Sequence, residues 1–198
     1  MNATPRIAMV KRATKETDVA ISLTLDGAGE TRIATGIGFF DHMLALLCRH
    51  ALFDVMIEAK GDREVDDHHT VEDVGICFGQ ALAQALGDKR GIARYGSLCL
   101  PMDEALAQVA LDLSGRPCLV WCCDLPAGKV GGFDICLGSE FFRALCNHAG
   151  ICLHASLLSG IDPHHCLEAI FKAVGRALRI AVAIDPRENG VPSSKGIL

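Results

Sequence analysis

The chain carries one pattern of residues twice, and this duplication constrains its fold more than any other feature. Residues 68–82 (HHTVEDVGICFGQAL) align with residues 164–178 (HHCLEAIFKAVGRAL), matching both histidines, a glutamate and later Gly, Ala and Leu residues. Residues 42–51 (HMLALLCRHA) align with residues 140–149 (EFFRALCNHA), matching Leu, Cys, His and Ala. The offset between the copies changes by only two residues from one block to the other. Self-similarity of this kind indicates an ancestral unit that was doubled.

Each copy predicts a β-β-α-β-α unit. Alternating apolar residues, such as Val19, Ile21 and Leu23, indicate strands, and apolar residues three or four apart indicate helices. In the first copy we expect strands over 18–27, 31–37 and 53–61, with 31–37 as the hairpin partner of 18–27, and helices over 40–51 and from an Asp66 or Asp67 cap to about residue 86. In the second copy we expect strands over 105–115, 117–125 and 151–160 and helices over 140–150 and 162–184.

Neither half can bury its apolar helix and strand faces alone, so we expect the two halves to pack as one mixed α/β (α+β) domain. The length of 198 residues suits this arrangement, and no Pro/Ser-rich linker separates the halves. We assign residues 1–92 to the first half, residues 93–184 to the second half and residues 185–198 to a polar C-terminal tail. Because aromatic residues make up only 5% of a chain that is 50% hydrophobic, the core should be mostly aliphatic.

Charge and composition argue against several kinds of partner and location. With a net charge of −5 and no basic stripe, the chain is not expected to bind nucleic acid. No apolar run approaches the roughly 18 residues of a membrane span, and the N-terminus lacks the apolar stretch of a signal peptide. The ten cysteines form no CxxC pair, so reduced thiols in the core are expected, above all at Cys48, Cys77, Cys146 and Cys152. These features predict a cytoplasmic protein without membrane association.

The repeated HHxxE motif predicts metal binding. On a helix, residues four apart share a face, so His68 lies over Glu72 and His164 lies over Glu168, and each pair can grip one ion. A single HHxxE motif is usually a polar surface, but two copies at matching positions, each after an acidic helix cap, favour a metal site.

The neighbouring donors extend this prediction to two ions. His69 and His165 point about 100° round their helices and must serve a different ion from their neighbours, if they serve one. His42 aligns with Glu140, and both residue types are competent ligands. The predicted sets are His42, His68, Glu72 and His165 for one ion and His69, Glu140, His164 and Glu168 for the other. Imidazole and carboxylate donors without thiolate suit Mn, Fe or Zn, and open positions on an octahedral ion would indicate a catalytic site.

The other polar candidates are less specific. His50 and His148 match in the repeat but have no neighbouring donor, so helix-end roles are expected, and His154 is expected as a hydrogen-bonded core residue. A phosphate could be bound by Arg94 and Arg116, which stand near glycine, by Lys172 one turn beyond Glu168, and by residues 192–196 (PSSKG). Solvated charge is the simpler explanation of each of these from the residues alone.

Five motifs resemble the imidazoleglycerol-phosphate dehydratase family over nearly the whole chain. They are FDHML (40–44), DDHHTVEDVG (66–75), SGRP (114–117), HHCLEAIFKA (164–173) and PSSKG (192–196). The resemblance implies a duplicated fold of the ribosomal-protein-S5-domain-2-like type and two Mn²⁺ ions per active site, with other divalent metals as alternatives. It also implies a homo-oligomer of 24 subunits with active sites at subunit interfaces. Many family members carry His at the position of Glu140, so that ligand departs from the family pattern.

The resemblance also implies roles for individual residues. The family's metal ligands fall on the eight donors named above, and its phosphate-binding residues fall on Arg94, Arg116, Lys172, Ser194 and Lys195. Glu16 is expected to touch the substrate from a neighbouring subunit and to shuttle a proton. The expected catalytic residues are Glu16, His42, His68, Glu72, His165 and Glu168.

The implied reaction is a dehydration in L-histidine biosynthesis by a monofunctional hydro-lyase. D-erythro-1-(imidazol-4-yl)glycerol 3-phosphate would lose water to give 3-(imidazol-4-yl)-2-oxopropyl phosphate, with the imidazolate held between two metal ions that withdraw electron density from it. Two alternatives use the same donors: a dinuclear metal-dependent hydrolase of phosphoesters or amides, and a non-catalytic metal-storing cage. The cage would have no use for Arg94, Arg116 and the PSSKG segment.

Overall fold

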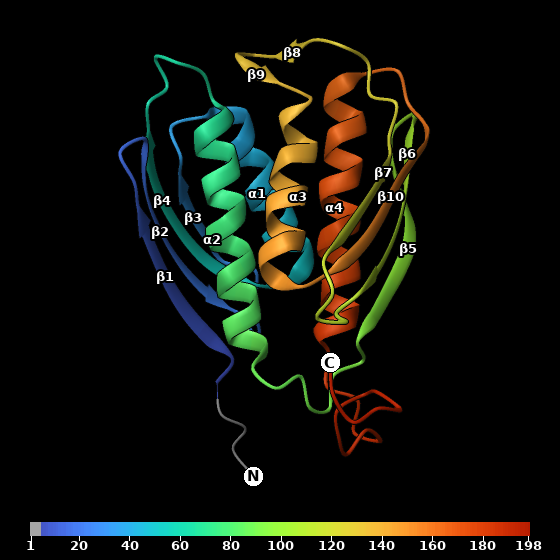
Figure 1. The fold of residues 1–198 in the computed structure, drawn as a ribbon. Helices are drawn as coiled ribbons and strands as arrows, with labels where there is room; N and C mark the ends of the chain where they lie inside the picture. Colours follow the sequence, from blue (N-terminus) through green and yellow to red (C-terminus); the bar gives the residue numbers. More distant parts are fainter. Residues whose placement is uncertain (1–4) are drawn as a thin grey trace.

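Two four-stranded sheets flank a layer of four long helices in the computed structural model, which describes residues 5–198 (Figure 1). Residues 1–4 of the first predicted half lie outside the described residues. The first half contains β1 (Ile7–Ala13), β2 (Thr17–Thr24), β3 (Thr31–Ala34), α1 (Gly38–Ala51), β4 (Asp54–Gly61) and α2 (His68–Leu86). The second half contains β5 (Tyr95–Met102), β6 (Ala105–Asp112), β7 (Cys118–Cys122), α3 (Leu137–Ala149), β10 (Cys152–Ser159) and α4 (Pro163–Val182), with a short hairpin of β8 (Lys129–Val130) and β9 (Phe133–Asp134) before α3.

The two sheets have the same topology. The strand order is β1-β2-β4-β3 in one sheet and β5-β6-β10-β7 in the other. In each sheet the last edge strand runs parallel to its neighbour, and the other pairs are antiparallel. The mixed α/β fold with two similar halves is therefore confirmed.

Two details of the sequence-based prediction are wrong. Each half begins with an additional strand, β1 or β5, and β3 pairs with β4 instead of forming a hairpin with β2, whose two sides are taken by β1 and β4. The strand β1 escaped prediction because the apolar residues Ile7 and Met9 face outward while Ala8 and Val10 face inward, which hides the two-residue period. In β5, Pro101 obscures the pattern, although proline is tolerated on an edge strand.

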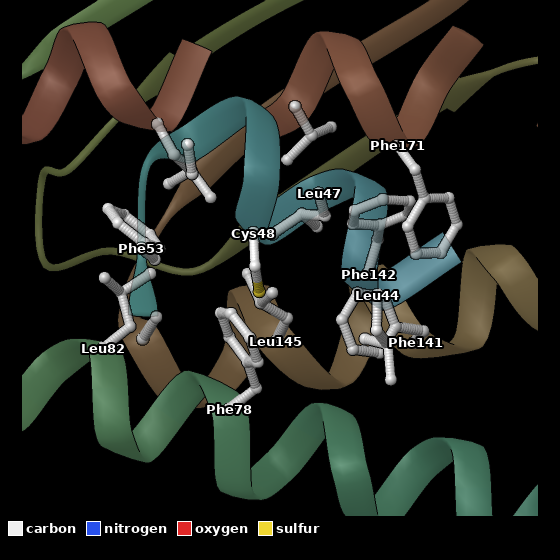
Figure 2. Close-up of a cluster of buried hydrophobic side chains, with 14 of the residues drawn as sticks. Leu44, Leu47, Cys48, Phe53, Phe78, Leu82, Phe141, Phe142, Leu145 and Phe171 are labelled. Atoms are coloured by element: carbon white, nitrogen blue, oxygen red, sulfur yellow. The ribbon is translucent and has the colours of Figure 1, made fainter. Parts of the chain in front are cut away.

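The helices pair across the two halves, α1 with α4 and α2 with α3. Glycines at equivalent positions allow this close approach: a Cβ on Gly79 would lie 2.6 Å from the carbonyl oxygen of Leu145, and one on Gly175 would lie 2.3 Å from that of Leu47. Figure 2 shows buried side chains from all four helices meeting in one cluster, including Leu47, Phe78, Leu145 and Phe171. The pairing brings the beginnings of helices from different halves together at one end of the layer (Figure 1).

Acidic residues fix where the two long helices begin. The backbone N–H of His68 donates to the Asp66 carboxylate at 2.7 Å, and Asp162 accepts from the backbone N–H groups of His164 and His165. The predicted cap at Asp162 is therefore confirmed, whereas α2 begins after Asp67, whose side chain makes no capping hydrogen bond, and ends at Gly87 as expected. Both His-His pairs consequently occupy the first turn of a helix.

The cysteines and the helices agree with the expectations drawn from composition. All ten cysteines are free, and Cys48, Cys77 and Cys146 are buried in the core, whereas Cys152 is half-buried on β10. Within residues 5–198, no helix combines the length and the apolar character that crossing a membrane requires.

Candidate metal centre

Three of the predicted donors converge where α1 and α4 begin. The donor atoms of His42, His164 and Glu168 all lie within 4.8 Å of one another, and this is the one such group found among residues 5–198. The Glu168 Oε2 atom is 3.0 Å from His164 Nε2 and 3.6 Å from His42 Nε2. This spacing is the one expected when residues four apart on a helix meet a third residue from a packed neighbour.

The carboxylate of Glu168 is the buried member of this group. Its side chain is 7% exposed, whereas those of His42 and His164 are 48% and 38% exposed. Lys172, one turn further along α4, forms an ion pair with Glu168 and also donates to Met102 Sδ at 3.4 Å. Burial raises the pKa of the Glu168 carboxyl, but Lys172, His164 and His42 together outweigh burial and hold that pKa below its ordinary value. Glu168 is therefore an anion directed toward the two imidazoles.

This grouping differs from the partition that the sequence predicted. His42 was expected to share an ion with His68 and Glu72, but in the chain it lies beside His164 and Glu168. The physical reason is the helix pairing, because α1 packs against α4 of the other half and not against α2. Within one chain, His42 therefore lies with donors of the other predicted set, and the partition of ligands between two ions stays a prediction.

The equivalent end of the α2–α3 pair is more open. Glu72 is exposed, and Glu140 at the start of α3 pairs with Arg143 on its own helix at 3.0 Å. His68 lines a hollow of about 550 Å³ between the start of α2 and the β8–β9 hairpin, together with Lys129 and Asp134. His68, Glu72 and Glu140 thus occupy positions equivalent to those of His164, Glu168 and His42, without converging as closely.

The second histidine of each pair is held by a carboxylate. His165 Nδ1 lies 2.8 Å from Glu104 Oε2, and His69 Nδ1 lies 3.1 Å from both oxygens of Asp62. Donating to these carboxylates raises the pKa of each imidazole. The backbone N–H of Asp162 and the His165 imidazole lower the pKa of Glu104 to about 2.

Sequence reasoning missed Asp62 and Glu104, although a signal for Glu104 exists. Glu16 lies in the β1–β2 turn and Glu104 lies at the same position of the β5–β6 turn, immediately before β2 and β6. Glu16 Oε2 is 4.0 Å from His69 Nδ1, so both turns bring a carboxylate toward a His-His pair. The equivalence becomes visible only once β1 and β5 are recognised.

Most of the predicted phosphate-binding residues gather at the opposite end of the helix layer, where α4 ends. Arg94 donates to both oxygens of Asp112 and, at 2.7 Å, to the carbonyl of Pro192 in the tail. The tail returns to the loop after β6, where Leu198 lies against Gly115 beside the exposed Arg116. Ser194 and Lys195 are exposed on this tail.

These residues are remote from the metal donors of the same chain. The backbone N–H of Arg94 donates to the carbonyl of Ala181, near the end of α4. At 1.5 Å per residue, Ala181 is about 25 Å along the helix from His164. Lys172 is the exception among the predicted phosphate ligands, because it lies beside Glu168. Within one chain, the metal donors and most of the predicted phosphate-binding residues are therefore far apart, although both were expected in one active site.

The predictions for the three histidines outside the metal sets, His50, His148 and His154, differ in how well the structure agrees with them. His148 Nδ1 lies 2.9 Å from the carbonyl of Ala144 near the end of α3, in agreement with a helix-end role. His50 lies near the end of α1, where its Cβ approaches Gly175. The prediction for His154 is wrong, because this residue is exposed on the outer face of β10.

The donor set fits a divalent transition metal. Imidazole nitrogens and a carboxylate, without a thiolate among His42, His164 and Glu168, are the ligands preferred by Mn, Fe and Zn. The partial exposure of both histidines leaves access for further ligands. The fold and this site define a duplicated α/β protein with a group of histidine and carboxylate side chains that could hold a metal ion.

Comparison with known proteins identifies the family. The family model for imidazoleglycerol-phosphate dehydratase matches residues 35–178. A relative of that name from Moorella thermoacetica is 55% identical over 193 residues, which cover 98% of each chain, and one from Roseobacter denitrificans is 60% identical over 190 residues, or 96% of this chain and 97% of the relative. The chain therefore belongs to the imidazoleglycerol-phosphate dehydratase family.

Solved structures agree with this conclusion. The crystal structure of imidazoleglycerol-phosphate dehydratase from Staphylococcus aureus has a TM-score of 0.82 and 43% identity, covering 90% of this chain and 99% of that one. The enzyme from Pyrococcus furiosus, crystallised in complex with (S)-C348, also has a TM-score of 0.82, with 34% identity over 96% of this chain and all of that one. The family is that of a dehydratase of histidine biosynthesis.

Proposed function

We propose that this protein is a metal-dependent hydro-lyase that dehydrates D-erythro-1-(imidazol-4-yl)glycerol 3-phosphate in the cytoplasm. The product would be 3-(imidazol-4-yl)-2-oxopropyl phosphate, an intermediate of L-histidine synthesis. The observation that carries the proposal is the convergence of His42, His164 and Glu168 where α1 and α4 begin, with donors at equivalent positions in the other helix pair.

The residues on the two helix pairs would hold two Mn²⁺ ions per active site, with other divalent metals as alternatives. Helix pairing supports a revised partition: His42, His164 and Glu168 for one ion, and His68, Glu72 and Glu140 for the other. His69 and His165 contact Asp62 and Glu104, which belong to neither group, so we propose that each histidine completes a site on a neighbouring chain. When bound, the two ions would draw electron density from the imidazole ring of the substrate.

The chain's own residues would supply the proton transfer and the positioning. Glu16 is 59% exposed, which suits a group that takes a carbon-bound proton from a bound substrate and returns it. Arg94, Arg116, Ser194 and Lys195 would bind the phosphate, and Lys172 would hold Glu168 while facing the same substrate. Fixing the phosphate would orient the imidazole ring toward the metal donors.

The separation of these groups supports an active site formed between chains. About 25 Å of α4 lies between the metal donors and the residues around Arg94. A substrate as small as an imidazole-glycerol phosphate cannot span that distance, so its phosphate must be bound by the residues of another copy of the chain. We therefore propose a homo-oligomer, of 24 subunits as the family resemblance suggested, with sites at subunit interfaces. Ions bound by residues from different chains would also stabilise the assembly.

The outer face of the second sheet supports such an assembly, and it differs from that of the first sheet. The hollow on the first sheet is lined by charged residues that include Lys11, Asp18, Glu58 and Lys60. The hollow on the second sheet is lined by Ser97, Leu98, Cys99, Gln108, Val109, Ala110, His154 and Ser156, without a carboxylate or an ammonium group. Charged residues are depleted from the centres of protein interfaces, so the second sheet suits a covered position.

The proposal is tested by identifying the product. Purified, Mn²⁺-loaded protein incubated with the imidazole-glycerol phosphate should form a ketone that retains its phosphate, detected by absorbance and mass spectrometry. Release of inorganic phosphate without a ketone would instead indicate a metal-dependent hydrolase and would overturn the proposal. Metal binding without any turnover would favour a storage role.

A further inference from the structure

In both His-His pairs, the second histidine contacts a carboxylate through its Nδ1 atom. His165 directs Nδ1 to Glu104 at 2.8 Å, and His69 directs Nδ1 to Asp62 at 3.1 Å. The two carboxylates come from different places in the repeat, Glu104 from the β5–β6 turn and Asp62 from the segment after β4. Two unrelated positions thus supply the same contact to equivalent histidines.

Glu104 is itself held in place. Its Oε1 atom accepts the backbone N–H groups of Asp162 at 2.8 Å and Ile161 at 3.2 Å, which leaves Oε2 for His165. The carboxylate therefore links the β5–β6 turn to the beginning of α4. Asp62 makes a simpler contact, since the side-chain hydrogen bonds of its carboxylate found within residues 5–198 are those with His69.

A carboxylate at Nδ1 determines which ring nitrogen can bind a metal. An ionised carboxylate only accepts hydrogen bonds, so the imidazole carries a proton on Nδ1, and the neutral ring then has its lone pair on Nε2. His165 Nε2 lies 3.6 Å from Asp103 Oδ2, beyond hydrogen-bond distance. Histidines that ligate metals commonly donate their other N–H to a carboxylate, which fixes the ring orientation and increases ligand basicity. We propose that Glu104 and Asp62 are positioning residues that present the Nε2 atoms of His165 and His69 to metal ions.

This inference rests on the proposed function, because it needs His69 and His165 to be metal ligands. It also gives different roles to the equivalent turn residues: Glu104 positions a histidine, and Glu16 contacts the substrate. Glu104 is tied to His165 and to two backbone N–H groups, whereas Glu16 stays 4.0 Å from His69 because Asp62 already holds that ring. In the first half, Asp62 thereby leaves the turn carboxylate available for the substrate.

The decisive substitution is Glu104→Gln. The glutamine oxygen can still accept the backbone N–H groups, but its amide N–H would then face Nδ1 and donate to it. This reverses the tautomer, places the proton on Nε2 and removes the lone pair from the proposed ligand atom. At His69 both oxygens of Asp62 face Nδ1, so an asparagine could still turn its oxygen to the ring, and the informative variant there is Asp62→Ala, which removes the acceptor.

The experiment measures Mn²⁺ binding to the full chain by equilibrium dialysis with elemental analysis, and thermal unfolding of the metal-free protein in parallel. Glu104→Gln and Asp62→Ala should each weaken Mn²⁺ binding at one of the two ion sites by about 10–100-fold. The unfolding midpoint of Asp62→Ala should stay close to that of the parent. Glu58→Gln, which changes an exposed carboxylate on the outer face of β4, should alter neither quantity.

The outcomes separate the two proposals. Parent-like Mn²⁺ affinity in both Asp62→Ala and Glu104→Gln would overturn the positioning role while leaving the dehydratase proposal intact. A parent protein that binds no Mn²⁺ or other divalent metal would overturn the proposed function itself. If Glu104→Gln unfolds, Asp62→Ala decides the question alone.

Discussion

The beginnings of the two helix pairs carry the same motif but differ in how far a single chain assembles them. At the α1–α4 end, Glu168 is buried, paired with Lys172 and within reach of two imidazoles. At the α2–α3 end, Glu72 is exposed, and the residue aligned with Lys172 is Ile76, which cannot form an ion pair. The short helices differ too, because His42 aligns with Glu140. A duplicated motif thus specifies which residues are donors, while their neighbours decide how firmly each donor is held.

The largest expected effect comes from removing one histidine of either helix pair. His164→Ala and His68→Ala should each lose one ion per site, and turnover should fall by about 10³-fold or more, because the ions are proposed to act together on one ring. Metal content and turnover measured on the same samples test this. His148→Ala is the matched control, because the imidazole of His148 contacts a backbone carbonyl and, within residues 5–198, no metal donor. Parent-like turnover in either variant would show that the corresponding helix pair is not part of the centre.

The next effect distinguishes the two equivalent turn residues. Glu16→Gln should bind substrate with a KM within a few-fold of the parent and lose about 10²–10⁴-fold in kcat, as expected when a general acid–base group is removed. Its content of bound Mn²⁺ should not change, in contrast to Glu104→Gln. Undiminished kcat in Glu16→Gln would remove its proposed role.

A stability effect should follow from making the α1–α4 end resemble the α2–α3 end. Lys172→Ile leaves the buried Glu168 carboxylate without its ammonium partner, which should cost about 3 kcal/mol of unfolding free energy in the metal-free protein. Added Mn²⁺ should recover part of the loss, since a bound cation restores the missing charge. Chemical denaturation with and without Mn²⁺ measures both terms. Lys60→Ile on the exposed face of β4 should stay within about 0.5 kcal/mol of the parent.

The smallest effect concerns a feature that the two helix pairs share. Gly79→Ala and Gly175→Ala each place a Cβ against a backbone carbonyl of the partner helix, so each should lower the unfolding free energy by about 1–3 kcal/mol. Gly38→Ala, with open space around its Cβ position, is the control. Similar losses in the two variants would support equal packing of the two pairs. A neutral result at Gly175 would mean that α1 and α4 can separate without cost.

The parts of the site that follow local rules could be predicted from the sequence. The i,i+4 spacing of His164 and Glu168 and the acidic cap at Asp162 depend only on helix geometry, and the structure has both. The partition of ligands could not be predicted, because it depends on which helices pack together across the halves. Glu104 was missed for a similar reason, since its contact with His165 joins a turn to a helix 61 residues away.

The fold shows the same division between local and non-local information. The duplicated order of strands and helices is visible in the repeated motifs, whereas the pairing of β3 with β4 depends on β1 occupying the free side of β2. Edge strands such as β1 and β5 have weak patterns because one face is exposed and still carries apolar residues such as Met9 and Tyr95. The number and pairing of the strands therefore depend on contacts between elements, which the periodicity of apolar residues does not reveal.

The central claim is that donors from both halves hold transition-metal ions on which dehydration depends. The most direct measurement is elemental analysis of the purified protein, made together with the dehydration assay before and after chelation. The account predicts about two transition-metal ions per chain, loss of turnover with their removal and recovery on adding Mn²⁺. Full turnover by protein free of transition metals would contradict it.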